Sequence, residues 1–194
     1  MDKKALEIEF KNLLSYEQFD QLRQALFSDV EGFTQTNFYI DTPHFDLKNA
    51  KIALRIRDIG TQKEMTLKIP QQVGIMEYNG IVDESITIEE FIQTDKVPQH
   101  ILDELTSRNI PIEQLKIFGA LSTERYIKSY ASGTLFLDAS HYLDQSDFEI
   151  EYEVTDYEKG KQEFKALLET YNIQPTEVKN KVQRFYDRYQ ALIR

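Results

Sequence analysis

The sequence predicts an α+β fold in which a mainly antiparallel sheet of eight strands packs against helices. Eight segments alternate apolar and polar residues with a period of two, which is typical of strands with one buried face. Four other segments repeat apolar residues with a helical period. The 194 residues contain no internal repeat and no linker rich in Gly, Pro or Ser, so we expect a single domain over residues 1–194.

The expected strands run through the whole chain. The first is "ALEIEFK", in which Ile8 and Phe10 alternate with Glu7, Glu9 and Lys11. Because successive side chains of a strand point to opposite sides, each segment has one apolar and one polar face. The eight segments are residues 5–11, 36–41, 51–58, 63–69, 80–88, 123–130, 133–138 and 147–154.

Four helices are expected between and after these strands. The first begins at Ser15, a favourable N-cap residue, and the last follows Pro175. In each of them apolar residues recur at helical spacing and form one stripe that can cover a sheet. They span residues 15–27, 97–109, 156–171 and 176–193.

The composition excludes several classes of protein. Hydrophobic residues make up 41% and charged residues 29%, as in soluble globular proteins, and no apolar window of about 18 residues could span a membrane. The N-terminal residues lack the apolar region of a signal peptide, and the absence of cysteine excludes thiol catalysis and disulfides, so we expect a cytoplasmic protein. The net charge of −10 disfavours nucleic acid as a partner.

The polar faces of four expected strands are sorted by the sign of their charge. A polar face is commonly solvated, and this explanation remains open for any single strand. Three glutamates at every second position repel one another, however, unless cations neutralise them. The acidic faces carry Glu7 and Glu9, and Glu149, Glu151 and Glu153, whereas the basic faces carry Arg55 and Arg57, and Lys68 beside Thr66.

Eight strands could close into a barrel whose interior carries glutamates on one wall and Arg and Lys on the other. Carboxylate oxygens are suitable ligands for Mg²⁺ or Mn²⁺. Arginine and lysine are suitable for binding a phosphate chain. The pattern therefore favours a metal and phosphate site over a solvated sheet face.

The order of these motifs resembles that of the CYTH superfamily, also called triphosphate tunnel metalloenzymes, and most closely its short, single-domain bacterial members. The likeness covers nearly the whole chain. It rests on the ExExK motif at Glu7, Glu9 and Lys11, on Tyr39-x-Asp41-Thr42, on Leu54-Arg55-Ile56-Arg57, on Thr66-Leu67-Lys68, on Arg125, on Asp138, on Glu149-x-Glu151, and on Lys179 and Lys181.

The resemblance implies an eight-stranded antiparallel tunnel with helices on its outside that binds a triphosphate and a divalent metal, Mg²⁺ or Mn²⁺. It implies metal binding by Glu7, Glu9, Glu149 and Glu151, and catalysis by Glu7, Glu9 and Lys11. The implied phosphate-binding residues are Lys11, Arg55, Arg57, Lys68, Arg125 and Lys181.

Six further positions are candidates, and five of them have two possible interpretations. Asp138 is either a metal ligand or a residue that supports the ligands, and Glu153 either joins the acidic stripe or lies at its wet end. Glu77 matches a family acid, but Asn79 stands where the family often has another. Tyr39 and Asp41 are either site residues or a packed aromatic and a strand-ending turn, and Lys179 is either a phosphate ligand or an exposed lysine.

Three functions are compatible with this reading. The first is metal-dependent hydrolysis of a small triphosphate, inorganic or organic. The second is a class IV-like adenylyl cyclase that makes cyclic AMP from ATP. The third is a module that binds a polyphosphate or triphosphate without turnover. The expected partner is in each case a small phosphate-bearing molecule, and the oligomeric state is not readable.

Overall fold

The computed structural model describes residues 3–82 and 90–193. In this part of the chain eight strands form a closed barrel in the order β1-β5-β4-β3-β2-β6-β7-β8. The strands are β1 (Lys3–Leu14), β2 (Phe33–Asp41), β3 (Ala53–Asp58), β4 (Lys63–Pro70), β5 (Ile75–Val82), β6 (Lys116–Tyr130), β7 (Gly133–Tyr142) and β8 (Gln145–Val154). The predicted α+β fold with an antiparallel barrel and helices is confirmed.

Five α-helices and two short 3₁₀ turns accompany these strands in the described residues. They are α1 (Tyr16–Leu26), α2 (Asp46–Asn49), α3 (Gln99–Ser107), α4 (Tyr157–Thr170), α5 (Lys181–Leu192), and the 3₁₀ turns Thr94–Lys96 and Ile112–Gln114. Over the described ranges no helix combines the length and the apolar character that a membrane crossing needs.

The contacts divide the chain into two compact units. Unit 1 comprises the described residues of Met1–Leu6 and Gln35–Leu121, and unit 2 comprises Glu7–Thr34 and the described residues of Ser122–Arg194. The strands β1, β2 and β6 contribute residues to both units. The expectation of a single domain stays a prediction.

The core of unit 1 lies between its strands and the helices α2 and α3. Leu54 and Ile56 on β3 are buried on the apolar face of the sheet, and Ile101 and Leu105 of α3 pack into the same cluster. Leu47 of α2 completes it and is fully buried. The alternation predicted for these strands therefore leaves the side chains between the core residues on the opposite, polar face.

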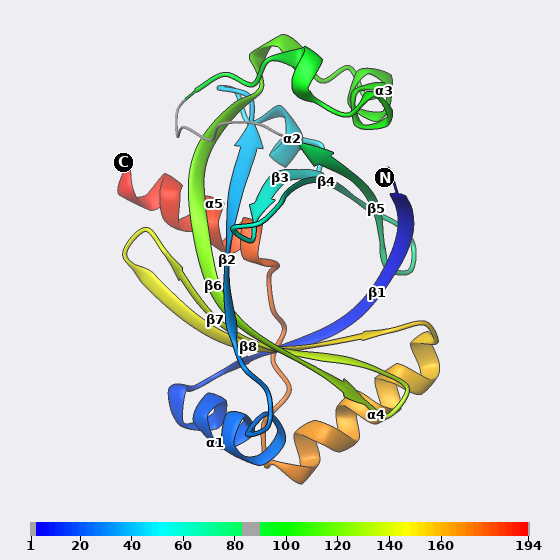
Figure 1. Cartoon of the computed structure of the whole chain (residues 1–194), viewed down its shortest axis with the longest axis vertical. Helices are drawn as coiled ribbons and strands as arrows, with labels where there is room; N and C mark the ends of the chain where they lie inside the picture. Colours follow the sequence, from blue (N-terminus) through cyan, green and yellow to red (C-terminus); the bar gives the residue numbers. More distant parts are fainter. Residues whose placement is uncertain (1–2, 83–89, 194) are drawn as a thin grey trace. The chain divides into compact units, whose positions relative to one another are not determined.

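Unit 2 places helices on both sides of the hairpin formed by β7 and β8 (Figure 1). On one side, Leu137 of β7 and Ile150 of β8 pack with Phe19 of α1 and Leu167 of α4. On the other side lies α5, whose Phe185 contacts Tyr142 at the end of β7. The polar residues of β7 and β8 alternate with the core residues, and therefore point toward the side that carries α5.

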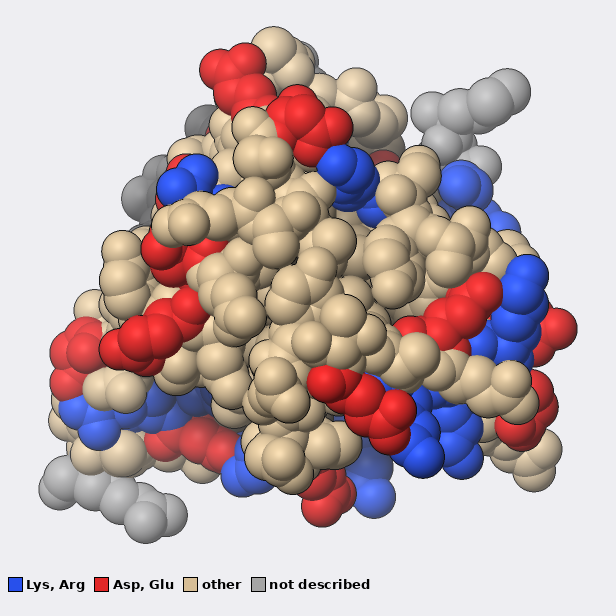
Figure 2. All heavy atoms as spheres, turned by 90° about the horizontal axis from the view of Figure 1, so that it is seen from below, with Lys and Arg blue, Asp and Glu red and all other residues tan. Residues whose placement is uncertain are grey.

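The surface over α1 and α4 is electrostatically mixed. Figure 2 shows acidic and basic side chains next to one another on this face, and no large area of one sign. This face of unit 2 is thus unlike the basic surface with which proteins bind a nucleic-acid backbone.

Local sequence signals explain where the helices begin. Ser15 is the N-cap of α1 as predicted, and it forms a capping box with Gln18, in which each side chain bonds to the other residue's backbone N–H. Asn180 and Gln183 form the same motif at the start of α5. The last helix therefore begins at Lys181, and the prediction that it begins just after Pro175 was wrong.

The strand predicted at residues 80–88 was placed too late. β5 runs from Ile75 to Val82, and residues 83–88 of the predicted segment lie outside the described residues. Ile75 and Met76 are adjacent apolar residues, so the segment does not alternate cleanly. Its pairing with β4, in which Tyr78 is opposite Leu67, supplies what the local pattern lacks.

β6 begins at Lys116, seven residues before the predicted start at residue 123. Ile117 and Phe118 are both buried although they are neighbours, because both faces of this part of β6 are covered. A strand covered on both faces shows a continuous apolar run and not an alternation, which explains the error.

Candidate metal and anion site

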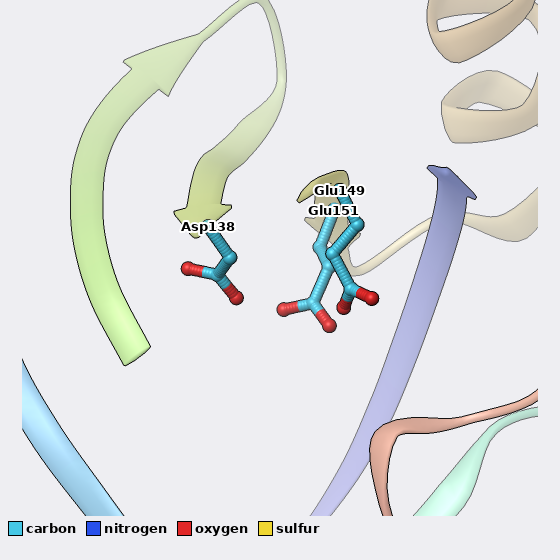
Figure 3. A group of neighbouring side chains, drawn as sticks. All are labelled: Asp138, Glu149 and Glu151. Atoms are coloured by element: carbon cyan, nitrogen blue, oxygen red, sulfur yellow. The ribbon is translucent and has the colours of Figure 1, made fainter. Parts of the chain in front are cut away.

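Three buried carboxylates lie together on β7 and β8. The antiparallel register places Asp138 opposite Glu149, and Glu151 follows on the same face of β8. Figure 3 shows the three side chains projecting to the same side of the two strands. One oxygen of each carboxylate lies within 4.8 Å of the others, and the three residues are 0%, 1% and 8% exposed, in that order.

Arg125 of β6 binds two of these acids. It lies opposite Asp138 in the register of β6 and β7. Its Nε donates to Asp138 Oδ1 at 2.8 Å and its Nη2 donates to Asp138 Oδ2 at 2.5 Å, which is a bidentate pair. The same Nη2 donates to Glu151 Oε2 at 2.7 Å.

Lys181 contacts all three acids. It is the first residue of α5, and its Nζ donates to Asp138 Oδ2 and to Glu151 Oε1, at 2.8 Å in both cases. It also donates to Glu149 Oε1. Because the N-cap Asn180 fixes where the helix begins, the Lys181 side chain enters the acidic cluster from the N-terminal end of α5.

Arg184 completes the set of cations and was missed in the sequence. Its Nη2 donates to Glu149 Oε2 and its Nε donates to Asp147 Oδ2 at 2.8 Å. Arg184 follows Lys181 by three residues, a spacing that places both side chains on one face of a helix. With the helix start known, that spacing would have identified it.

The buried charges shift each other's pKa values in opposite directions. Burial raises the pKa of Glu149 to about 6, against the attraction of Lys181 and with the repulsion of Glu151. Burial alone would also raise the pKa of Glu151, but Lys181 and Arg125 outweigh it and hold this pKa well below its usual range. Burial would lower the pKa of Lys181, yet the three carboxylates raise it well above its ordinary value.

Glu9 and Lys11 of β1 lie on the same face as this cluster. Lys11 is opposite Glu151 and Glu9 is opposite Glu153 in the register of β1 and β8. Lys11 donates to Glu9, and the pKa of Lys11 is raised because the charges of Glu9 and Glu151 exceed the effect of its burial. Glu7 and Glu9 lie outside the group of three acids that could share one ion, and Glu153 is exposed.

Unit 1 carries the three other predicted phosphate-binding residues. Arg55 and Arg57 occupy the polar face of β3, opposite Tyr39 and Asn37 of β2, respectively. Arg57 Nε donates to Asn37 Oδ1 at 3.2 Å. Arg55 Nε is buried and has no hydrogen-bond partner among the residues that the structure describes.

Lys68 lies in a polar network across β4 and β5. Its Nζ is 2.6 Å from Glu77 Oε1, which forms an ion pair. Asn79 connects Glu77 to Thr66, because its amide donates to Glu77 Oε2 at 3.4 Å while its oxygen accepts from Thr66 Oγ1 at 2.7 Å. Asn79 is thus an uncharged residue that holds the carboxylate of Glu77 and the hydroxyl of Thr66 by hydrogen bonds.

Asp41 has a clear structural role. Its buried carboxylate accepts the backbone N–H groups of Thr42, Leu47 and Lys48 at 2.7, 2.9 and 3.1 Å, and so joins the end of β2 to α2. These contacts agree with the interpretation of Asp41 as a strand-ending turn.

Tyr39 is packed against an aromatic residue, and Lys179 lies at the surface. Tyr39 is 3% exposed and its ring stacks on Phe118 with centroids 6.3 Å apart. Lys179 precedes α5 and is exposed, and its Nζ donates to Asp187 Oδ2 at 2.6 Å.

The group of Asp138, Glu149 and Glu151 fits a hard divalent cation by its chemistry. It offers only carboxylate oxygens, which are the ligands that Mg²⁺ and Mn²⁺ prefer. Buried acids at such short separations require cations nearby, and in the described structure lysine and arginine side chains supply them.

Comparisons with known proteins agree with this fold. The family model described as "CYTH domain" matches residues 5–186. "Putative triphosphatase YjbK" of Bacillus subtilis is 38% identical over 184 residues, which cover 94% of this chain and 95% of that protein.

Two solved structures show the same architecture. The crystal structure of "a putative adenylate cyclase" from Bacillus halodurans has a TM-score of 0.81 and 36% identity, and the match covers 94% of this chain and 98% of that one. The "putative adenylyl cyclase HpAC1" from Hippeastrum, described as having a dominant triphosphatase activity, has a TM-score of 0.70 and 21% identity over 94% of this chain and 96% of its own. By its sequence, its barrel and the length of the match, the chain belongs to the CYTH domain family.

Proposed function

We propose that this protein is a divalent-metal-dependent triphosphatase that hydrolyses a small inorganic or organic triphosphate. The observation that carries the proposal is the buried group of Asp138, Glu149 and Glu151, whose oxygens lie within 4.8 Å of one another and are surrounded by cations. The 38% identity to a protein named a "putative triphosphatase" supports the same reaction.

Asp138, Glu149 and Glu151 would hold Mg²⁺ or Mn²⁺. Bound there, the ion would neutralise charge on phosphate oxygens, which is the usual contribution of a divalent metal to phosphoryl transfer. Glu7 and Glu9 remain the predicted further acids of the site. They lie on the face of β1 that continues the acidic face of β8.

The basic residues would bind and orient the triphosphate. In unit 2 these are Lys11, Arg125 and Lys181, all of which contact the acids of the cluster or of β1. Arg55, Arg57 and Lys68 of unit 1 remain predicted phosphate-binding residues. The buried Nε of Arg55, which has no hydrogen-bond partner in the described residues, supports an anion-binding role for this side chain.

Hydrolysis requires a base for the attacking water. Water attacks the terminal phosphorus, the bond from that phosphorus to the bridging oxygen breaks, and orthophosphate and the shortened phosphate leave. We assign acceptance of the water's proton to Glu9 or Glu7, and we assign Lys11, which donates to Glu9, to the orientation of that carboxylate. If Glu9→Gln and Glu7→Gln both leave hydrolysis intact, this assignment is wrong.

A second candidate is an adenylyl cyclase, and the 36% identity to the Bacillus halodurans protein favours it. In that reaction the ribose 3′-hydroxyl attacks the α-phosphorus of ATP and pyrophosphate leaves. It uses the same acids and cations but also requires binding of adenosine, to which we assign no residue.

A substrate panel distinguishes these functions. The purified protein is given tripolyphosphate, thiamine triphosphate or nucleoside triphosphates with Mg²⁺ or Mn²⁺, and orthophosphate, pyrophosphate and cyclic AMP are measured together. Metal-dependent release of orthophosphate is the expected result. Cyclic AMP with pyrophosphate would establish the cyclase instead, and binding of tripolyphosphate without any product would indicate a non-catalytic binding module.

A further inference from the structure

We infer that Lys181 occupies the cation position of the acidic cluster and must leave it before a divalent metal binds there. The inference rests on the proposed metal site, and it adds that one residue of α5 competes with the metal for the same oxygens. It makes Lys181 a residue that sets the affinity of the site for metal.

The contacts of the ammonium group resemble those of a bound ion. Lys181 Nζ takes one oxygen from each carboxylate: Oδ2 of Asp138, Oε1 of Glu149 and Oε1 of Glu151. A lysine ammonium has three N–H donors, and here all three meet an acid. Its side chain is only 12% exposed, so water replaces few of these contacts.

The remaining oxygens of the three acids are also in use. Arg125 takes Asp138 Oδ1 and Glu151 Oε2, and Arg184 takes Glu149 Oε2. All six carboxylate oxygens thus accept from a cation of the chain. A metal ion binds carboxylate oxygens at about 2.0–2.6 Å, so it cannot share the three inner oxygens with an ammonium at hydrogen-bond distance.

The attachment of α5 allows Lys181 to leave without loss of the helix. Lys181 is the first helical residue, where only the N-cap of Asn180 precedes it. Arg184, about one turn later, holds the helix through Asp147 as well as through Glu149. Withdrawal of Lys181 therefore disturbs the first turn of α5 while Arg184 still anchors it.

Replacement of Lys181 by a metal ion would couple metal binding to substrate binding. The three carboxylates face the three cations Lys181, Arg125 and Arg184, and Arg184 also pairs with Asp147. A divalent ion in place of the ammonium makes the cluster more positive by one charge, and a triphosphate then has both that charge and the released Lys181 to bind.

The test measures binding of Mn²⁺ alone, by titration calorimetry and by the loss of the free-ion electron paramagnetic resonance signal. Three proteins are compared: the wild type, Lys181→Met and the control Lys165→Met. Lys165 is an exposed helix lysine that pairs with Glu169 at 3.7 Å, so its replacement matches the change in chemistry. We expect Lys181→Met to bind Mn²⁺ more tightly by roughly tenfold or more, and Lys165→Met to bind like the wild type.

Equal or weaker binding by folded Lys181→Met would overturn the inference. Should this variant fail to fold, hydrogen exchange on the wild type decides the question. Hydrogen exchange of the amides in the first turn of α5 should become faster when Mn²⁺ is added to the wild type, and should not become faster in Asp138→Asn. Unchanged protection of these amides in the wild type with Mn²⁺ bound would contradict the replacement of Lys181 by the metal.

These results are separate from the test of the proposed function. Tighter binding of Mn²⁺ by Lys181→Met in a protein that hydrolyses no triphosphate would support the exchange and refute the triphosphatase. Metal-dependent hydrolysis by the wild type, with equal Mn²⁺ affinity in the wild type and Lys181→Met, would support the triphosphatase and refute the replacement of Lys181 by metal.

Discussion

Each buried carboxylate of the acidic cluster is stabilised by the charged side chains around it. Burying a carboxylate costs free energy unless a cation and hydrogen bonds compensate. Asp138 obtains this compensation from Arg125 and Lys181. Glu149 obtains it from Lys181 and Arg184 but lies beside Glu151, which has the same charge. Glu149 therefore retains a proton more readily than Glu151 does.

The raised pKa of Glu149 has a measurable effect on stability. Its pKa is about 6 in the folded protein and the ordinary value is 4.5, so between these pH values the folded protein holds a proton that the unfolded chain has released. Stability contributed by this group therefore falls as pH rises through that window, by about 1–2 kcal/mol. Glu149→Gln cannot titrate and lacks this loss.

Urea unfolding of the metal-free wild type and of Glu149→Gln at several pH values measures the difference. The stability of the variant relative to the wild type should increase between about pH 4.5 and pH 6 and stay constant above it. A pH-independent difference would show that Glu149 titrates normally.

At the scale of elements, α5 positions the cations of the site. Its start is fixed by the capping box of Asn180 and Gln183, and the preceding segment is held on β1 by Asn12, whose Oδ1 accepts the backbone N–H of Thr176 at 2.6 Å. Because Lys181 directly follows the N-cap, loss of the cap should move the ammonium as well as destabilise the helix.

The matched variants Asn180→Ala and Ser15→Ala test this role of α5. Each removes the N-cap of a capping box in unit 2, so each should lower the free energy of unfolding by about 1 kcal/mol. Only Asn180→Ala should change Mn²⁺ binding and triphosphate turnover, because α5 carries cations that contact the acidic cluster and α1 does not. Equal effects of the two variants on Mn²⁺ binding would contradict the assignment.

Much of this arrangement could be predicted from alternation and motif order. The strands that carry Glu149 and Glu151, Arg55 and Arg57, and the ExExK motif follow the period of two, so their polar faces were readable. The start of β5 was not readable, because its pairing with β4 overrides a weak local pattern. Arg184 was missed because its role depends on where α5 begins, which the cap at Asn180 decides.

The central position of Asp138 was only partly predictable. The motif order singled it out, but its contacts with Arg125 and Lys181 join residues far apart in the sequence. Such contacts follow from the register of β6 with β7 and from the docking of α5, and local periodicity contains neither.

At the scale of the whole molecule, the described strands close into a barrel, so each strand has two neighbours. Closure removes the exposed edges through which sheets associate. The chain is acidic overall, with a net charge of −10. Under the proposed function a polyanionic substrate would be bound against this net charge, so its binding should depend on local cations and on metal.

Ligand binding should therefore stabilise the folded protein only when metal is present. At a ligand concentration of about one hundred times Kd the gain is about 2.7 kcal/mol, which corresponds to a rise in Tm of roughly 5–10 °C for a chain of this length. Calorimetry with tripolyphosphate and Mn²⁺ measures the shift, and excess EDTA should abolish it. A shift that is equally large in EDTA would show that the anion binds without metal.

The most direct test of the account is the initial rate at which orthophosphate is released from tripolyphosphate with Mg²⁺ or Mn²⁺ by Asp138→Asn and by Asp144→Asn. Asp138 is fully buried among the cations of the cluster, whereas Asp144 pairs with Arg188 at the surface. The account predicts that Asp138→Asn loses roughly a hundredfold or more of the wild-type rate while Asp144→Asn retains it. Wild-type turnover by folded Asp138→Asn would contradict the claim that this buried cluster is the centre of the reaction.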